Sequence, residues 1–415
     1  MKMSIIVIGD EILLGQVTDT TSGAIARTFD PFGWQVASIC TVGDDARDIS
    51  DALNRAFDSS DFVITTGGLG PTKDDITKKV LMDNFGGRLV HDESVAENIR
   101  RVFALRGLKL NASTEAQAMV PSSCRIIQNL YGTAPVMWFE RDGKVLVSMP
   151  GVPFETEGML PEVARQAIKH YQSHMRLMHR SAMVCGITES ALSERLEEFE
   201  HNLDARLHLA YLPSPGLIRL RLDGRTNAED TEAEAVFEDA FAKLCNELGD
   251  LLIYEGDANA AEILLDMLRR HSLTVASAES CTGGTIASRI TAVAGASDVF
   301  TGSVVSYSND VKTQVLGVST HDLAEYGAVS RNVVEQMARG VCELTGARCS
   351  MATSGIAGPG GGSEEKPVGT VWMAWCVDGH VHAREFHFPG NRERVIDRAS
   401  TEAMLQLVNH IRNHE

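Results

Sequence analysis

Residues 273–290 read Leu273-Thr-Val-Ala-Ser-Ala-Glu-Ser280-Cys-Thr-Gly-Gly284-Thr-Ile-Ala-Ser-Arg-Ile290. This stretch joins an apolar run, a turn and a helical pattern. Residues 273–277 predict a short buried strand, and residues 285–290 have helical spacing. A serine at such a turn can expose its hydroxyl beside free backbone N–H groups, which suits a nucleophile with an oxyanion hole. The pattern is equally typical of a serine that caps a helix in a phosphate-binding turn. Both interpretations stay open on this stretch alone.

A second polar cluster, Ser303-Val-Val-Ser-Tyr307-Ser-Asn-Asp-Val-Lys312, follows the serine along the chain. Residues 302–306 predict a strand, and a helix is expected from about residue 310. Lys312 lies in the first turn of that helix, where the helix dipole favours acidic side chains, so it is either a solvated lysine or a functional one. These loops hold no histidine. Because burial can lower the pKa of a lysine enough for it to accept a proton, Ser280 and Lys312 form the most economical catalytic pair.

A glycine-rich loop, Thr353-Ser354-Gly355-Ile-Ala-Gly358-Pro-Gly360-Gly361-Gly362, follows a predicted strand at residues 350–352. Small residues permit a close backbone approach to a ligand and leave N–H groups free for a phosphate. Three such loops at strand ends in one α/β domain indicate a functional site more strongly than any of them alone.

These motifs resemble the CinA family, and the last 155 or so residues resemble its nicotinamide mononucleotide amidohydrolase (PncC-type) members. The resemblance is carried by AESCTGG at 278–284, YSNDVK at 307–312, SGIAGPGGG at 354–362 and KPVGTVW at 366–372. It implies that the carboxamide of nicotinamide mononucleotide is hydrolysed to nicotinic acid mononucleotide and ammonia, without a metal. Ser280 would be the nucleophile and Lys312 the general base, while Tyr307 would orient the lysine or the substrate. N–H groups around Thr282, Gly283 and Gly284 are assigned to the oxyanion, and the loop with Ser354, Gly355, Gly358, Gly360 and Gly361 to the mononucleotide.

The bulk composition restricts the classes of partner. The 415 residues carry a formal net charge of −18 without a run of Lys or Arg, so nucleic acid is not expected as a partner. Eight scattered cysteines without a CxxC pair are typical of reduced thiols. The apolar run at residues 4–8 is too short for a signal peptide, and no run reaches membrane-spanning length. We expect a cytoplasmic protein without membrane contact.

The chain length and the strand and helix signals predict an α/β protein with three parts. Residues 1–168 and 256–415 each predict a three-layer α/β domain with a parallel-type sheet. Residues 169–255 predict a small α+β module of β-α-β-β-α type, a spacer or a dimerisation module. A homodimer is therefore expected.

Two loops in the first domain lie where parallel strands are expected to end, at residues 9–16 and 65–77. The second contains Gly67-Gly68-Leu-Gly70, which can cradle a phosphate, followed by Asp74 and Asp75. These two carboxylates would either hold a divalent cation that bridges to phosphate or simply cap the next helix.

The first 165 or so residues resemble the molybdopterin-binding (MoaB/MogA-like) domain as it occurs in CinA, with GGLGPTKDD as the specific part. This resemblance implies an ADP-ribose pyrophosphatase that uses Mg²⁺ or Co²⁺, with K⁺ as a further ion. Asp10, Asp74 and Asp75 would then be metal or phosphate-site residues. Asp19-Thr20-Thr21 stands where the family commonly has Asn-Thr-Asn. The alternative functions are a molybdopterin-binding protein or a competence-related accessory protein without catalysis.

Overall fold

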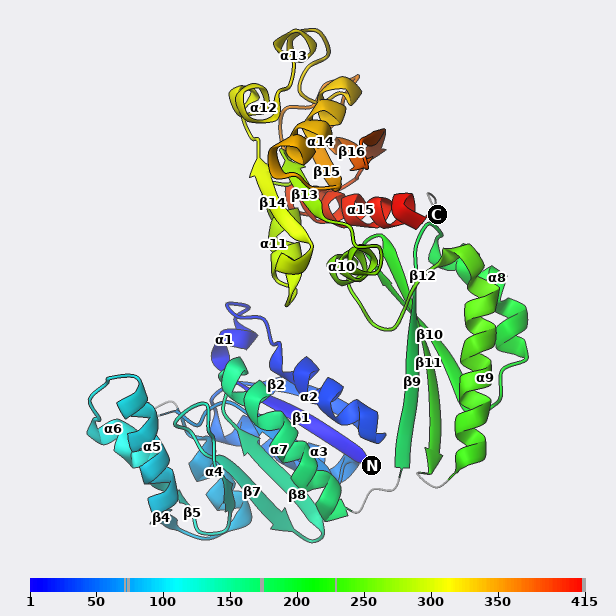
Figure 1. The fold of residues 1–415 in the computed structure, drawn as a ribbon. Coiled ribbons are helices and arrows are strands. Elements are labelled where there is room, and N and C mark those ends of the chain that lie inside the picture. Colours follow the sequence, from blue (N-terminus) through cyan, green and yellow to red (C-terminus); the bar gives the residue numbers. More distant parts are fainter. Residues whose placement is uncertain (71, 73–74, 172–174, 228–229, 413–415) are drawn as a thin grey trace. The chain divides into compact units, whose positions relative to one another are not determined.

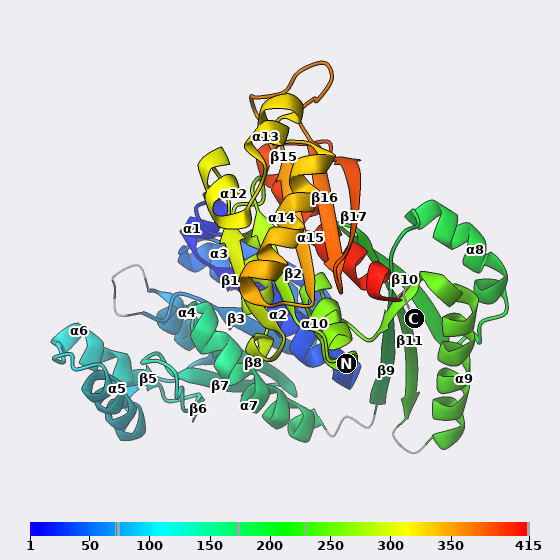
Figure 2. The same cartoon turned by 45° about the horizontal axis from the view of Figure 1, so that its top comes forward.

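The computed structural model describes residues 1–70, 72, 75–171, 175–227 and 230–412. The chain divides into two compact units, residues 1–179 with 224–235 and residues 180–223 with 236–415. In both units helices pack against β-sheets (Figures 1 and 2). The predicted α/β class, with parallel-type sheets on either side of a small α+β module in the sequence, is confirmed.

A six-stranded sheet in the order β2-β1-β3-β8-β7-β6 forms the core of the first unit. Side chains of β1 alternate between its two faces, as the period of an extended strand requires. Met3, Ile5 and Val7 join the core under α2 and α7, whereas Ile6 and Ile8 join the core under α3 and α4. The strands are β1 (Lys2–Ile8), β2 (Gln35–Val42), β3 (Phe62–Thr66), β6 (Arg125–Ile127), β7 (Val136–Arg141) and β8 (Lys144–Met149). The helices are α1 (Asp10–Leu13), α2 (Thr21–Phe29), α3 (Ala46–Ser59), α4 (Thr77–Phe85), α5 (Glu93–Leu105), α6 (Ala112–Glu115) and α7 (Pro153–Tyr171).

One side of this sheet departs from the parallel arrangement. β2, β1, β3 and β8 are parallel, but β7 pairs antiparallel with both β8 and β6. Asp142 and Gly143 join β7 to β8, and both have positive φ, as a two-residue hairpin turn requires. Two short strands, β4 (Leu89–His91) and β5 (Met119–Pro121), form a separate antiparallel pair.

The small module has a four-stranded sheet in the order β10-β11-β9-β12. Its strands are β9 (Met175–Val184), β10 (Leu207–Ser214), β11 (Leu217–Asn227) and β12 (Leu252–Glu255), and its helices are α8 (Glu189–His201) and α9 (Thr231–Leu248). The predicted β-α-β-β-α order does not include β12, which pairs antiparallel with β9. Met183, Leu217 and Ile253 belong to the same hydrophobic core as three helices of the C-terminal domain, α10 (Ala260–Arg270), α11 (Thr285–Thr291) and α15 (Arg392–Arg412). This part of the module therefore shares its core with that domain.

The C-terminal domain is built on a sheet in the order β14-β13-β15-β16-β17. β13 lies between β14 and β15 and is parallel to both, whereas β16 and β17 are antiparallel additions. The strands are β13 (Val275–Glu279), β14 (Phe300–Val305), β15 (Cys349–Gly355), β16 (Thr370–Val377) and β17 (His380–His387). The helices are α10 (Ala260–Arg270), α11 (Thr285–Thr291), α12 (Asn309–Leu316), α13 (Thr320–Tyr326), α14 (Arg331–Thr345) and α15 (Arg392–Arg412).

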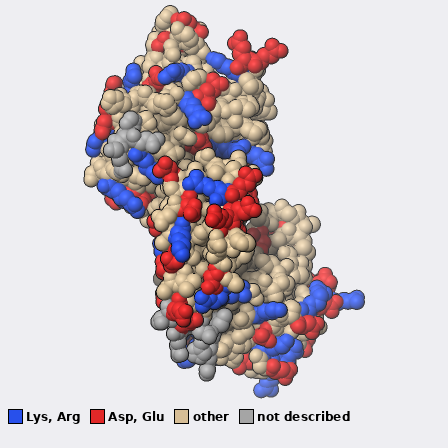
Figure 3. Space-filling view, turned by 90° about the vertical axis from the view of Figure 1, so that its right-hand side faces the viewer, with Lys and Arg blue, Asp and Glu red and all other residues tan. Residues whose placement is uncertain are grey.

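Charged side chains of both signs lie on the surface (Figure 3). Lysine and arginine are interspersed with acidic side chains on the face shown in Figure 3. Among the helices of the described ranges, none is both long enough and apolar enough to cross a membrane.

Candidate active site

Ser280 stands at the carboxyl end of β13, in the turn before α11. Its backbone N–H donates to the carbonyl of Thr353 at 2.9 Å, which ties the turn to the end of β15. On the other side, the N–H of Ser306 donates to the carbonyl of Glu279 at 2.8 Å. Both neighbouring strands thus hold the serine at the point where parallel strands end, and its side chain is only partly buried.

Lys312 approaches this serine from the first turn of α12. Its Nζ lies 3.0 Å from the Oγ of Ser280 and 2.5 Å from the carbonyl oxygen of Ser306. The side chain is 1% exposed, and no ion pair involves it within the described part of the chain. Burial lowers the pKa of Lys312 below its ordinary value, because the ammonium form loses hydration without gaining a carboxylate partner. The predicted Ser–Lys pair is therefore brought together.

Glu279 is a site residue that the sequence interpretation missed. It is fully buried at the N-terminal end of α11. Its Oε2 accepts hydrogen bonds from Thr282 Oγ1 at 2.7 Å, Gly284 N at 2.9 Å and Ile286 N at 3.1 Å, and Oε1 accepts from Ala287 N at 2.9 Å. A carboxylate in this position satisfies helix N–H groups that would otherwise lack acceptors. In the sequence, the one sign of this role is that Glu279 directly precedes Ser280.

The N–H groups assigned to the oxyanion need a correction. Gly284 N donates to Glu279, and Gly283 N donates to the carbonyl of Ser280 at 3.2 Å, so neither is free. In the described ranges, the N–H groups of Cys281 and Thr282 have no acceptor from another residue. The Thr282 side chain is buried and shares a hydrogen bond with Thr353 Oγ1 at 2.8 Å, so it positions the turn instead of facing a ligand.

The glycine-rich loop is anchored at both ends. Ser354 is buried, and its Oγ donates to the carbonyl of Ala328 at 2.7 Å, so this hydroxyl is already engaged. A Cβ on Gly355 would come within 2.7 Å of the carbonyl of Thr370, which leaves room only for glycine. Gly358 and Gly361 have positive φ, and residues 360–365 are exposed.

Within the described ranges, no hydrogen bond joins Tyr307 to Lys312. Its side chain is 63% exposed, and its hydroxyl accepts a hydrogen bond from Arg392 Nη2 at 2.9 Å. Arg392 Nη1 donates to the carbonyl of Gly358 at 2.8 Å. This arginine, at the start of α15, thus links Tyr307 to the glycine-rich loop. Sequence reasoning missed it because it lies 85 residues after Tyr307.

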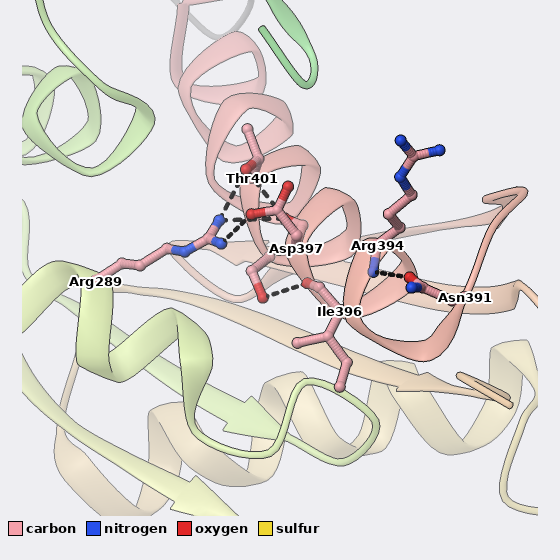
Figure 4. A network of polar contacts seen from close by, with 7 residues as sticks. Arg289, Asn391, Arg394, Ile396, Asp397 and Thr401 are labelled. Atoms are coloured by element: carbon pink, nitrogen blue, oxygen red, sulfur yellow. Dashed lines mark hydrogen bonds and ion pairs between the residues drawn. The ribbon is translucent and has the colours of Figure 1, made fainter. Parts of the chain in front are cut away.

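A cavity of about 860 Å³ lies beside Arg392, between α11 and the first turns of α15. Figure 4 shows its polar wall, where Arg289 of α11 reaches Asp397 and Thr401 of α15. Arg289 forms an ion pair with Asp397 and donates to Thr401 Oγ1 at 2.8 Å. At the start of α15, Asn391 Oδ1 accepts a hydrogen bond from the backbone N–H of Arg394 at 3.0 Å and caps this helix. The Arg394 side chain points away from this network (Figure 4).

In the first unit, carboxylates meet at the ends of β1 and β2. The N–H groups of Asp10 and Asp44 each donate to the other's carboxylate at 3.2 Å. Burial, and then the carboxylates of Asp10, Glu11 and Asp75, raise the pKa of Asp44. The sequence interpretation missed Asp44, although it follows a predicted parallel strand.

The carboxylate of Asp75 holds the described part of the loop at residues 65–77. Its Oδ1 accepts from Gly70 N at 2.7 Å, and its Oδ2 accepts from Thr72 N at 2.8 Å. Both bonds stay within the loop, and α4 begins without a side-chain cap, so Asp75 does not cap the next helix, which was the alternative to metal binding. Asp74 lies outside the described residues. Gly67 and Gly68 have positive φ, and a Cβ on Gly67 would lie 2.0 Å from the carbonyl oxygen of Ile8. No group of three or more His, Cys, Asp or Glu side chains that could hold a metal ion occurs among the residues described.

Three family models match consecutive parts of the chain. They are a probable molybdopterin binding domain at residues 4–170, the damage-inducible protein CinA KH domain at 179–253 and the CinA C-terminal domain at 257–411. A CinA-like protein of Cytophaga hutchinsonii is 41% identical over 97% of this chain and 96% of its own length. A CinA-like protein of Flavobacterium psychrophilum is 38% identical over 99% of each chain. A solved CinA superfamily protein from Klebsiella pneumoniae is 34% identical over 38% of this chain and 99% of its own, with a TM-score of 0.36.

Proposed function

This chain belongs to the CinA family, and from that premise we propose that its C-terminal domain hydrolyses the carboxamide of nicotinamide mononucleotide. The products are nicotinic acid mononucleotide and ammonia. The observation that carries the proposal is the 3.0 Å contact between Ser280 Oγ and Nζ of the buried Lys312. A hydroxyl beside an amine with a lowered pKa is the donor–acceptor pair that nucleophilic attack on an amide needs.

The proposed reaction runs through an acyl-enzyme. Neutral Lys312 takes the proton from Ser280 as Oγ bonds to the carboxamide carbon. The resulting ammonium returns this proton to the leaving nitrogen, so that ammonia departs and an ester to Ser280 remains. Lys312 then takes a proton from water, which attacks the ester carbon, and returns it to Ser280 Oγ as the acid leaves.

The turn supplies the electrostatic part of the mechanism. Because the N–H groups of Gly283 and Gly284 are engaged, we assign the oxyanion to the N–H groups of Cys281 and Thr282. The N–H of the residue that follows a nucleophile is a common oxyanion donor. Glu279 keeps this turn in place through its bonds to the start of α11.

The substrate phosphate is expected near Arg392. This guanidinium already holds the glycine-rich loop at Gly358 and the Tyr307 hydroxyl, and it borders the 860 Å³ cavity. Arginine can offer further donors to a phosphate in a fixed fork. In this arrangement Tyr307 contributes to substrate placement through its hydrogen bond with Arg392.

Ammonia release from nicotinamide mononucleotide, measured in the presence of a chelator, tests the proposal. Ser280→Ala and Lys312→Met should each lose at least about a thousandfold in kcat. Ser288→Ala, on the exposed side of α11, is the matched control and should keep the wild-type rate. Wild-type rates in both site variants would refute the mechanism, and a wild-type protein that releases no ammonia would refute the function.

For the N-terminal domain we infer a second, metal-dependent activity, the cleavage of ADP-ribose at its pyrophosphate. The favouring observation is the pair Asp10 and Asp44, whose adjacent charges help raise the pKa of Asp44. A divalent cation such as Mg²⁺ is often held by one or two carboxylates together with phosphate oxygens, so two side chains fit such an ion without a third protein ligand. When bound, the cation would neutralise charge on the pyrophosphate, and Asp75 would keep the glycine loop in shape for the phosphates.

This second activity has its own test. Release of AMP from ADP-ribose with Mg²⁺ or Co²⁺ should survive Ser280→Ala and fall at least a hundredfold in Asp10→Asn/Asp44→Asn. Ser59→Ala, at the exposed end of α3, serves as the control. If the wild type binds a pterin but does not cleave ADP-ribose, the domain is a binding module and this inference fails.

A further inference from the structure

A second cavity, of about 790 Å³, lies in the unit that contains the C-terminal domain. The hairpin between β10 and β11 forms one wall, and residues of α10, α11 and α15 form the others. We propose that this cavity, which shares the Arg289–Asp397 pair with the cavity beside Arg392, is a second binding site, for an uncharged nucleoside.

The walls are held in place by a shared core. Met183 and Leu217, which line the cavity, pack in one hydrophobic core with residues of α10 and α15. At the tip of the hairpin, Gly216 approaches α15 so closely that a Cβ would lie 3.2 Å from Leu405 Cδ1. A pocket between packed elements is preformed, and its volume is within the usual range for small-molecule sites.

The charges of the lining cancel. Its four charged residues form two ion pairs, Arg219 with Asp257 and Arg289 with Asp397. Arg289 is held further by Thr401 Oγ1. Because each guanidinium already faces a carboxylate, the cavity offers no net positive charge to a phosphate. A ligand that carries its own charge would have to leave water without a counter-charge, so an uncharged ligand is favoured.

The remaining lining suits a flat heteroaromatic ring with hydroxyl groups. Thioethers of Met183 and Met404 and the rings of Pro213 and Pro215 provide apolar walls, and sulfur–aromatic contacts are favourable. Carboxylates of Asp257 and Asp397, 63% and 42% exposed, can accept hydrogen bonds from ribose hydroxyls. A purine nucleoside combines these features in a volume that the cavity can hold.

Adenosine binding to the full-length protein, measured by titration calorimetry, tests this proposal without any turnover. Ala292 lines the cavity at the end of α11, where a larger side chain would fill it. We expect Ala292→Phe to weaken adenosine binding at least tenfold. Ala324→Phe, on an exposed position of α13 outside the cavity, should leave the affinity unchanged.

Further arms separate this site from the two nucleotide sites. Binding should persist in Ser280→Ala and in Asp10→Asn/Asp44→Asn, and AMP should bind at least tenfold more weakly than adenosine. The proposal is overturned if no adenosine binding is measurable at millimolar concentration, if Ala292→Phe binds like wild type, or if AMP binds as well as adenosine. Because no arm depends on ammonia release or ADP-ribose cleavage, failure here leaves the proposed activities untouched.

Discussion

Replacing Glu279 by glutamine should loosen the turn that carries Ser280 while the size of the side chain stays the same. The carboxylate is fully buried and accepts from the N–H groups of Gly284, Ile286 and Ala287 as well as from the Thr282 hydroxyl. A glutamine has one acceptor oxygen, so its NH₂ group must face at least one of these donors.

The magnitude follows from that mismatch. A buried N–H without an acceptor costs about 1–3 kcal/mol, and removing the charge weakens the remaining bonds by roughly 1 kcal/mol. The start of α11 should therefore lose about 2–4 kcal/mol of local stability, which corresponds to roughly thirtyfold to several hundredfold faster amide exchange at Ala287. Because the turn also positions Ser280 and the proposed oxyanion donors, kcat should fall by about ten- to a hundredfold.

Hydrogen exchange followed by mass spectrometry or NMR, together with an ammonia-release assay, measures both effects. Glu262→Gln is the control, because Glu262 also accepts a backbone hydrogen bond at a helix start, from Asn259 N at 2.7 Å, but is exposed. That change should cost at most about 1 kcal/mol and leave kcat unaltered. If exchange and kcat in Glu279→Gln match those of Glu262→Gln, the buried carboxylate does not hold the site.

Four further outcomes are expected. Because burial lowers the pKa of Lys312, kcat/KM should rise with pH as the ammonium deprotonates. The rise should level off at a pH below the ordinary lysine pKa of 10.5, and a plateau reached only above 10.5 would contradict this expectation. At pH values between the lowered pKa of folded Lys312 and the ordinary value of the unfolded chain, the unfolded chain binds more protons at this lysine. The free energy of unfolding should therefore rise with pH more in wild type than in Lys312→Met. Arg392→Met should raise KM for nicotinamide mononucleotide about tenfold or more but not for the unphosphorylated riboside, and equal increases would exclude a phosphate contact. Gly67→Ala, where a Cβ meets Ile8 at 2.0 Å, should abolish ADP-ribose cleavage and leave ammonia release intact, as two separate assays would show.

Local sequence patterns were enough to predict the strands and the strand-end loops that carry both candidate sites. The apolar run before Ser280 and the small residues after it predict a strand, a turn and a helix, which the structure has as β13, a turn and α11. The parallel-sheet expectation then places the loops at 278–284, 303–312 and 353–362 at the same edge, because parallel neighbours end together. The antiparallel β7 was missed, although the Asp142-Gly143 pair is a hairpin signal.

What the sequence determined by itself was the α/β class, the three-part order, the family and the Ser280–Lys312 pair, since each depends on short-range spacing or on motifs. What only the tertiary structure decided depends on residues far apart in the chain. Burial of Glu279 under α11, the bridge from Arg392 to Tyr307 and Gly358, and the pairing of Asp10 with Asp44 all arise when separate strand ends and helix starts meet. Hydrogen bonding and desolvation depend on these three-dimensional neighbours, and no local pattern records them.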